Sequence, residues 1–222
     1  MSRYIQKLIS EGEHMRQDFK FEITDSRKIA RTLAAFANTR GGRILIGVKD
    51  NGNISGISSD EEYHMIEAAA QMYCRPEITF ESRKWHIQGK TVLEVIIPES
   101  DRKPVTAQLG EGSWKAFIRI HDENKLAGSV QVSVWKKERR KKGVYFPYDA
   151  EKKILLEYLS ANRAISQSAY CRIARINRKE AVEILSDLVV LGVIQIQYRE
   201  DAWLYSLVPG PNLPEPPVSH EA

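Results

Sequence analysis

The chain has 222 residues, a formal net charge of +4 and a composition typical of a soluble globular protein. This length allows one or two domains with a sizeable core, and the mild basic excess permits nucleic-acid binding without requiring it. No apolar run is long enough to span a bilayer, and the N-terminus lacks the apolar core of a signal peptide. We therefore expect a cytoplasmic protein with no membrane partner. Cys74 and Cys171 lie far apart and predict neither a disulfide nor a zinc site.

The first two predicted elements are a short helix and a strand. Residues 3–10 place their apolar side chains on one helical face. Residues 18–23 alternate polar and apolar side chains, which predicts a strand whose buried face carries Phe19, Phe21 and Ile23.

A capped helix and a hairpin follow. Asp25 or Ser26 can cap a helix that ends before Gly41-Gly42, since glycine adopts the left-handed conformation of a helix end without steric cost. Residues 43–48 form an apolar strand, and Asn51-Gly52 indicates a hairpin turn. After a second helix, strand-like segments complete the domain at 78–82, 85–88, 92–97, 103–107 and 115–120. We assign residues 1–130 to a domain of the α/β (α+β) class, with a two-layer mixed sheet and helices.

Several of these stretches resemble the Schlafen AlbA-like domain family, over roughly residues 5–130. They are Glu13 followed by Asp18-Phe-Lys20, LAAFANTRGG at 33–42, ILIGVKD at 44–50, Gly52 to Gly56, and AFIRI at 116–120. The family is often described as ATP-binding, but Gly41-Gly42 is not part of a Gly-x-x-x-x-Gly-Lys-[Ser/Thr] loop, so we expect no cofactor.

Some members of this family are metal-dependent nucleases that use two glutamates five residues apart and a later aspartate. The resemblance therefore implies Glu13, Asp18 and Asp50 as candidate catalytic residues, which would hold Mg²⁺ or Mn²⁺ through carboxylate oxygens. Asp18 is one methylene shorter than the family's usual glutamate, and Asp50 is equally typical of a turn beside Asn51-Gly52.

A basic segment follows the first domain. Residues 135–142, WKKERRKK, hold six basic residues and one acidic residue. We expect residues 131–147 to be a linker, which is either simply solvated or an arm that binds phosphates.

The remaining chain shows helical patterns at 149–161, 166–174 and 177–192, then strands at 193–198 and 202–207. Three helices followed by a hairpin are the order of a winged helix-turn-helix domain, which we place at 148–208. Its third helix would read bases, although Glu180, Glu183 and Asp187 would repel phosphate and such domains also dock proteins. Residues 209–222 hold five of the nine prolines and predict a disordered tail.

We interpret the chain as a non-enzymatic nucleic-acid-binding protein, a transcriptional regulator that prefers DNA to RNA. Because single modules bind DNA weakly, a homodimer that presents two such units would suit this function. The alternatives are a metal-dependent endoribonuclease or other nuclease, and a protein-interaction adaptor. The candidate nucleic-acid-binding residues are Arg27, Lys28, Arg31, Arg40, Lys136, Lys137, Arg139, Arg140, Lys141, Lys142, Arg172, Arg175, Asn177, Arg178 and Lys179.

Overall fold

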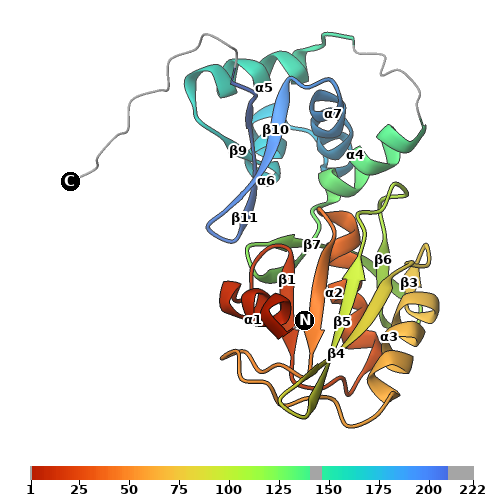
Figure 1. Cartoon of the computed structure of the whole chain (residues 1–222). Coiled ribbons are helices and arrows are strands. Elements are labelled where there is room, and N and C mark those ends of the chain that lie inside the picture. Colours follow the sequence, from red (N-terminus) through yellow and green to blue (C-terminus); the bar gives the residue numbers. More distant parts are fainter. Residues whose placement is uncertain (1, 141–146, 210–222) are drawn as a thin grey trace. The chain divides into compact units, whose positions relative to one another are not determined.

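The structure is a computed structural model that describes residues 2–140 and 147–209 (Figure 1). The chain divides into two compact units, Met1–Ala127 and Gly128–Ala222. Each unit has a hydrophobic core of its own. Within the described ranges, no helix combines the length and the apolar character needed to cross a membrane.

The described part of the first unit contains two four-stranded sheets. The first sheet has the order β1-β2-β5-β4, from β1 (Gln17–Lys20), β2 (Gly42–Ile46), β4 (Glu81–Ile87) and β5 (Lys90–Ile97). It is mixed, because β1 and β2 are parallel whereas the other pairs are antiparallel. The second sheet is antiparallel and consists of β3 (Cys74–Arg75), β6 (Thr106–Gly110), β7 (Ser113–Ile120) and β8 (Glu123–Leu126). The predicted α+β class with a mixed sheet is confirmed, although the strands form two sheets.

Helix α2 (Ser26–Asn38) is the centre of this unit. Asp25 is its N-cap, and the Asp25 carboxylate accepts hydrogen bonds from the backbone N–H groups of Arg27 and Lys28. From Ile29 to Asn38, Arg31 alone is not buried, and the core that contains α2 draws residues from strands of both sheets. Helix α3 (Glu61–Met72) also packs in this core, and α1 (Ser2–Glu11) joins a second cluster on the other face of the first sheet.

The end of α2 explains the Asn-Thr-x-Gly-Gly sequence in structural terms. The buried Asn38 amide donates to the carbonyl oxygens of Val105 and Phe117 and accepts from the Val105 N–H, so it joins α2 to the second sheet. A Cβ on Gly42 would lie 2.3 Å from the Phe36 ring, and one on Gly41 would lie 2.7 Å from a backbone oxygen. The glycine pair is therefore required by close packing.

The prediction for Phe21 is wrong. Strand β1 ends at Lys20, and Phe21 is 49% exposed, because the chain leaves the sheet one residue before it. The Lys49 ammonium lies 5.4 Å from the centre of the Phe21 ring.

The second unit combines helices with a small antiparallel sheet of order β10-β11-β9. Its described elements are α4 (Ser129–Arg140), α5 (Ala150–Ala161), β9 (Ile165–Ser166), α6 (Gln167–Ala174), α7 (Arg178–Val190), β10 (Ile194–Arg199) and β11 (Ala202–Leu207). The three helices and the hairpin predicted after residue 148 are present, and their interpretation as a winged helix stays a prediction.

The prediction of a linker at 131–147 is wrong for residues 131–140, which belong to helix α4. Val130 and Val134 stand one helical turn apart and are buried in the core of the second unit, which fixes this helix in place. Lys141, Lys142 and the proline-rich tail from residue 210 lie outside the described residues.

Candidate functional site

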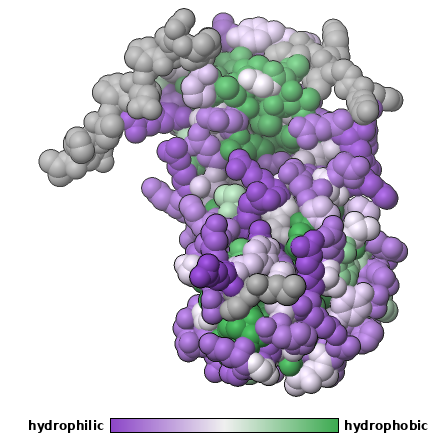
Figure 2. Space-filling view, viewed as in Figure 1, coloured by the Kyte–Doolittle hydropathy of each residue, from purple (hydrophilic) through white to green (hydrophobic). Residues whose placement is uncertain are grey.

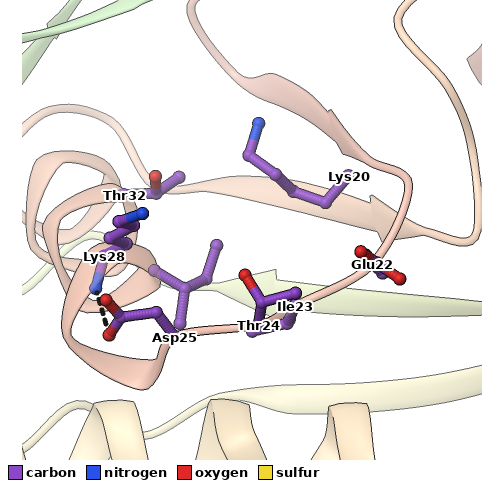
Figure 3. A pocket seen from close by; sticks show the side chains of 8 residues that line it. Lys20, Glu22, Ile23, Thr24, Asp25, Lys28 and Thr32 are labelled. Atoms are coloured by element: carbon purple, nitrogen blue, oxygen red, sulfur yellow. Dashed lines mark hydrogen bonds between the residues drawn. The ribbon is translucent and has the colours of Figure 1, made fainter.

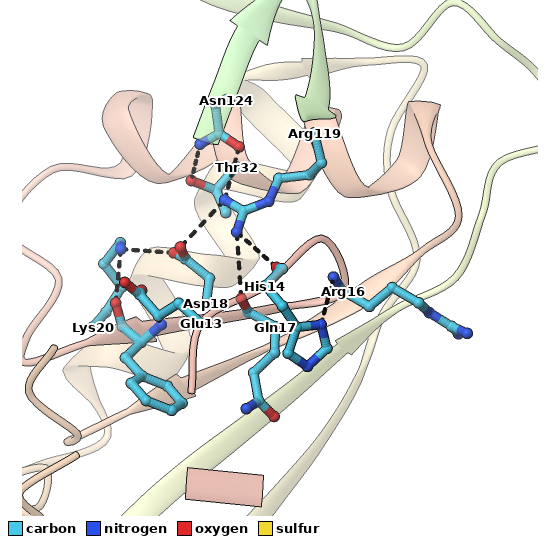
Figure 4. Close-up of polar contacts among 10 residues, drawn as sticks. Glu13, His14, Arg16, Gln17, Asp18, Lys20, Thr32, Arg119 and Asn124 are labelled. Atoms are coloured by element: carbon cyan, nitrogen blue, oxygen red, sulfur yellow. Dashed lines mark hydrogen bonds and ion pairs between the residues drawn. The ribbon is translucent and has the colours of Figure 1, made fainter. Parts of the chain in front are cut away.

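A buried arginine organises the polar residues around β1 (Figure 4). The Arg119 side chain comes from β7 and is 1% exposed. Its guanidinium donates to the Asp18 carboxylate at 3.2 Å, to the Asn124 amide oxygen at 3.2 Å, and to the backbone oxygens of His14 at 3.1 Å and Gln17 at 3.3 Å. The Asn124 amide in turn donates to the Thr32 hydroxyl on α2. Arg119 therefore ties β1 and the loop before it to β7.

Asp18 has a second cationic partner in Lys20. The Lys20 ammonium lies 2.6 Å from the other Asp18 carboxylate oxygen and also donates to the Phe19 carbonyl. Both oxygens of the Asp18 carboxylate are thus engaged by cations of the chain itself.

Glu13 lies beside this pair. One of its carboxylate oxygens accepts a hydrogen bond from the Phe19 N–H at 2.8 Å. Burial raises the pKa of Glu13 above its ordinary value, the Phe19 N–H opposes this rise, and the Asp18 and Asp50 carboxylates add to it. The three predicted acidic residues are therefore close enough to interact electrostatically.

The predicted metal site is nevertheless not assembled. Among the residues that the structure describes, no three His, Cys, Asp or Glu side chains are grouped so that they could hold a metal ion. At Asp18 the physical reason is that both carboxylate oxygens are already paired with cations of the chain, Arg119 and Lys20, and not with a metal ion.

Glu13 also borders an open hollow of 490 Å³, which His14, Met15, His121 and Asp122 complete. The hollow brings together two histidines 107 positions apart in the sequence, which the pattern of the sequence could not reveal. Its lining carries as many carboxylates as imidazoles, so it offers no clear site for a phosphate.

The predicted basic residues of the first unit do not converge. Arg27 and Lys28 are exposed near the start of α2, where the Arg27 guanidinium lies 5.4 Å from the Tyr73 ring. Arg31 is half-buried. Arg40 lies beyond the other end of α2, which at a rise of about 1.5 Å per residue puts it about 20 Å from Arg27. Lys28 and Lys20 line a cavity of 210 Å³ whose lining also includes Glu22 and Asp25 (Figure 3).

The basic residues of the second unit are more concentrated. The segment from Arg172 to Lys179 contains Arg172, Arg175, Arg178 and Lys179 and no acidic residue. It includes the turn between α6 and α7, in which Arg175 adopts a left-handed conformation at the end of α6. All four of these cations are exposed. We call these four residues the α6–α7 cationic turn.

Asn177 and Glu180 have structural roles at the start of α7. The Asn177 amide oxygen caps the helix, and the Glu180 carboxylate accepts a hydrogen bond from the Asn177 N–H. The predicted role of Asn177 in nucleic-acid contact therefore competes with its capping role.

The basic residues of α4 differ in whether their side chains are free to contact nucleic acid. Lys136, Arg139 and Arg140 are exposed. Lys137 is not available as predicted, because its ammonium lies 2.6 Å from the Asp187 carboxylate and 3.3 Å from the Glu183 carboxylate, and its side chain is 17% exposed.

These observations define a two-sheet α+β domain built around one buried helix and followed by a smaller unit of helices with a three-stranded sheet. The family described as Schlafen, AlbA_2 matches residues 13–128, more than half of the chain. The chain belongs to this family, and the resemblance found in the sequence is confirmed. The matched region ends next to the boundary between the two units.

Two solved structures are similar to the chain. The DIP2311 protein from Corynebacterium diphtheriae has a TM-score of 0.44 and 17% identity, and the match covers 65% of this chain and 32% of that protein. The N-terminal domain of a RecG-related protein from Nitrosomonas europaea has a TM-score of 0.39 and 23% identity, with 53% of this chain and 86% of that domain covered. The chain thus spans about a third of the C. diphtheriae protein. A comparison with curated proteins found no match.

Proposed function

We propose that this protein binds nucleic acid and acts as a DNA-binding transcriptional regulator. The observation that carries the proposal is the α6–α7 cationic turn, in which four cations stand within eight residues and no carboxylate intervenes. Such a cluster gains affinity for a phosphate backbone by releasing the counterions condensed on it. Membership of the Schlafen AlbA_2 family supports a nucleic-acid-related function.

The acidic residues of α7 oppose this role only in part. Glu180 is held in the capping box of α7, and Glu183 and Asp187 are paired with Lys137 of α4. Lys137 offsets one of these three negative charges, and the four cations of the turn outnumber the two that remain. A homodimer would present two such turns to one duplex and so raise the affinity of a weakly binding unit.

The test is a binding titration of the full chain with duplex DNA over a range of salt concentrations. The variant Arg172→Ala/Arg178→Ala/Lys179→Ala should reduce the slope of log K against log salt by about 2.7, which is 0.9 for each phosphate that the variant no longer neutralises. The control Arg3→Ala/Lys7→Ala/Arg83→Ala removes the same charge from exposed positions of the first unit and should leave most of the slope intact. An equal reduction of the slope in both variants would show that total charge, and not this turn, determines binding.

The alternative function is that of a metal-dependent nuclease. The observation in its favour is that Glu13 lies close enough to the Asp18 and Asp50 carboxylates for both to raise its pKa, although burial is the larger cause of that rise. Such an activity would require Asp18 to exchange Arg119 and Lys20 for a metal ion. Cleavage of RNA or single-stranded DNA that depends on Mg²⁺ or Mn²⁺ and is abolished by Asp50→Ala would establish it.

A protein-interaction adaptor is the third candidate. The second unit exposes several large hydrophobic side chains, namely Tyr148, Ile173, Leu191, Val193 and Val208. Figure 2 shows hydrophobic residues gathered on the visible face of this unit. Absence of both nucleic-acid binding and cleavage would favour this candidate over the other two.

A further inference from the structure

The second sheet of the first unit is covered by a helix on one face. Ala107 and Phe117 belong to the core around α2, so this face lies against α2. Of the helices in residues 2–127, α2 alone packs across β6, β7 and β8. Side chains alternate along a strand, so the neighbours of these buried residues point away from α2. We call the side to which they point the outer face of the second sheet.

Four side chains of the outer face lie next to one another. Arg75 follows the buried Cys74 in β3 and therefore points outward. Thr106 of β6 stands opposite Arg75. Gln108, also of β6, stands opposite Trp114 of β7, and none of the four outward side chains is buried. The outer face thus combines a large aromatic ring and a cation with two neutral hydrogen-bonding side chains.

Arg75 and Trp114 form a cation–π pair. The Arg75 guanidinium lies over the Trp114 ring, 4.0 Å from its centre. Strand β6 separates β3 from β7, so the Arg75 side chain reaches across roughly 10 Å of the sheet, twice the spacing of neighbouring strands. At 4.0 Å the two groups are in van der Waals contact, which leaves no room for a ligand between them. The side of the guanidinium that faces away from Trp114 can accept a ligand, because Arg75 is exposed.

A second pair of the same kind borders the outer face. The Arg27 guanidinium lies 5.4 Å from the centre of the Tyr73 ring. The Tyr73 carbonyl accepts a hydrogen bond from the Gln108 N–H, so Tyr73 and Trp114 stand on either side of β6. The backbones of these two aromatic residues are therefore separated by roughly 10 Å.

The cations of this region are not neutralised by pairing. Among the described residues, no carboxylate forms an ion pair with Arg27, Arg75 or the exposed Lys115. Glu77 and Glu111 are exposed and are the nearest carboxylates in the sequence to this surface. Three cations therefore stand beside two carboxylates, a balance that attracts phosphates.

Unpaired bases suit these side chains better than a duplex does. The bases of single strands stack on aromatic rings and on arginine guanidinium groups, and their edges form hydrogen bonds with neutral side chains such as Gln108 and Thr106. The bases of a duplex are stacked on one another and offer no free plane. Stacking uses the π-face that every base has, so it requires little sequence preference.

We infer that the outer face of the second sheet, centred on Arg75 and Trp114, binds the unpaired bases of single-stranded nucleic acid. A base stacks on the guanidinium, and Arg27 and Lys115 attract the phosphates beside it. This site lies in the first unit and goes beyond the proposed function, in which the α6–α7 cationic turn of the second unit contacts the phosphates of a duplex.

The test measures binding of the full chain to two single strands of equal length and charge. One is an oligothymidylate of about 16 nucleotides, and the other is the same sugar–phosphate backbone without bases. The oligothymidylate should bind more tightly. Trp114→Ala should weaken its binding by roughly fivefold to 150-fold, the contribution of one stacked base, and should leave binding of the abasic strand unchanged. Arg75→Lys keeps the charge but removes the planar guanidinium, and it should weaken oligothymidylate binding by roughly twofold to fivefold. Because Arg75 is exposed, this second variant tests the site even where Trp114→Ala does not fold.

Two matched controls remove similar groups elsewhere. Tyr148→Ala deletes an aromatic ring that is 63% exposed in the second unit, and Arg83→Lys replaces an exposed guanidinium outside the second sheet. Neither should change the ratio of the two affinities. The variant Arg172→Ala/Arg178→Ala/Lys179→Ala should also retain the ratio, which separates this site from the cationic turn. An oligouridylate measured in parallel shows whether RNA or DNA binds more tightly, and a preference for bases in either strand supports the site. Equal affinity for the strands with and without bases, or a ratio that Trp114→Ala and Arg75→Lys change no more than the controls do, would overturn the inference. Absence of all single-strand binding would overturn it as well and would leave a protein partner as the occupant of this face.

Discussion

Replacement of Arg119 by methionine is the sharpest test of how the first unit is held together. Methionine retains much of the apolar stem but removes the guanidinium, which is 1% exposed and makes four hydrogen bonds. Breaking a buried ion pair by removing one partner costs about 3–5 kcal/mol, and each buried carbonyl left without a donor adds about 1 kcal/mol or more. Lys20 stays beside Asp18 with a side chain that is 37% exposed and offsets part of this cost. We expect a destabilisation of about 4 kcal/mol.

Because the chain has two units, its global unfolding need not be two-state, and the assay must report on the first unit alone. Hydrogen exchange of the α2 amides from Leu33 to Ala37 meets this need, since these residues form the centre of the core. Arg83→Met, at an exposed position, is the control. A destabilisation below about 1 kcal/mol for Arg119→Met would refute the reasoning. The double variant Arg119→Met/Asp18→Asn should recover part of the stability, because it removes the carboxylate left without its guanidinium.

Three further predictions concern Glu13, Asn38 and the cysteines. The pKa of Glu13 is higher in the folded state than in the unfolded state, so protonated Glu13 favours folding. This contribution to the free energy of unfolding is present below the unfolded pKa and is lost as the pH rises through the folded pKa. Glu13→Gln should therefore stabilise the first unit at neutral pH, and this gain should vanish in denaturation experiments as the pH falls below the usual pKa of glutamic acid. Asn38→Ala leaves three buried backbone hydrogen-bonding groups without their partner and should cost about 3 kcal/mol or more in the same hydrogen-exchange assay, whereas Asn53→Ala in the exposed turn should cost far less. Burial raises the pKa of Cys74 to about 12, so at pH 8 a thiol reagent should label Cys171 alone in the native chain and both cysteines in denaturant; rapid native labelling of Cys74 would contradict its burial.

The sequence predicted those parts of the fold that depend on local patterns. Helix α2 and its Asp25 cap follow from a polar cap followed by an apolar stripe within a few residues. The glycines after α2 are equally local signals, because a helix end and a close approach both demand glycine. The family can be recognised from the sequence because the residues of α2 and the glycine pair that follows it stand in one short stretch.

The role of Arg119 depends on an interaction that no local pattern encodes. Its carboxylate partner, Asp18, lies 101 positions away, and the sequence suggested Asp18 as a metal ligand. A usable signal was nonetheless present, because Arg119 shares an inward-facing strand position with Phe117, which is buried. A charged side chain at such a position requires a buried partner of opposite charge.

The charged residues of α4 outnumber its apolar residues, which is why the sequence predicts a linker where the structure has a helix. The one-turn spacing of Val130 and Val134 is a real helical signal, but six cations in the eight residues from 135 to 142 favoured the interpretation as a solvated linker. The prediction for Phe21 fails for a different reason, because an alternating pattern does not reveal the residue at which a strand leaves its sheet.

The measurement that tests the proposed function most directly is the salt dependence of duplex-DNA binding by the full chain and by its Arg172→Ala/Arg178→Ala/Lys179→Ala variant. The proposal predicts affinity that falls steeply with salt in the unmodified chain and a slope smaller by about 2.7 in the variant. Binding that does not depend on salt, or an unchanged slope in the variant, would contradict it.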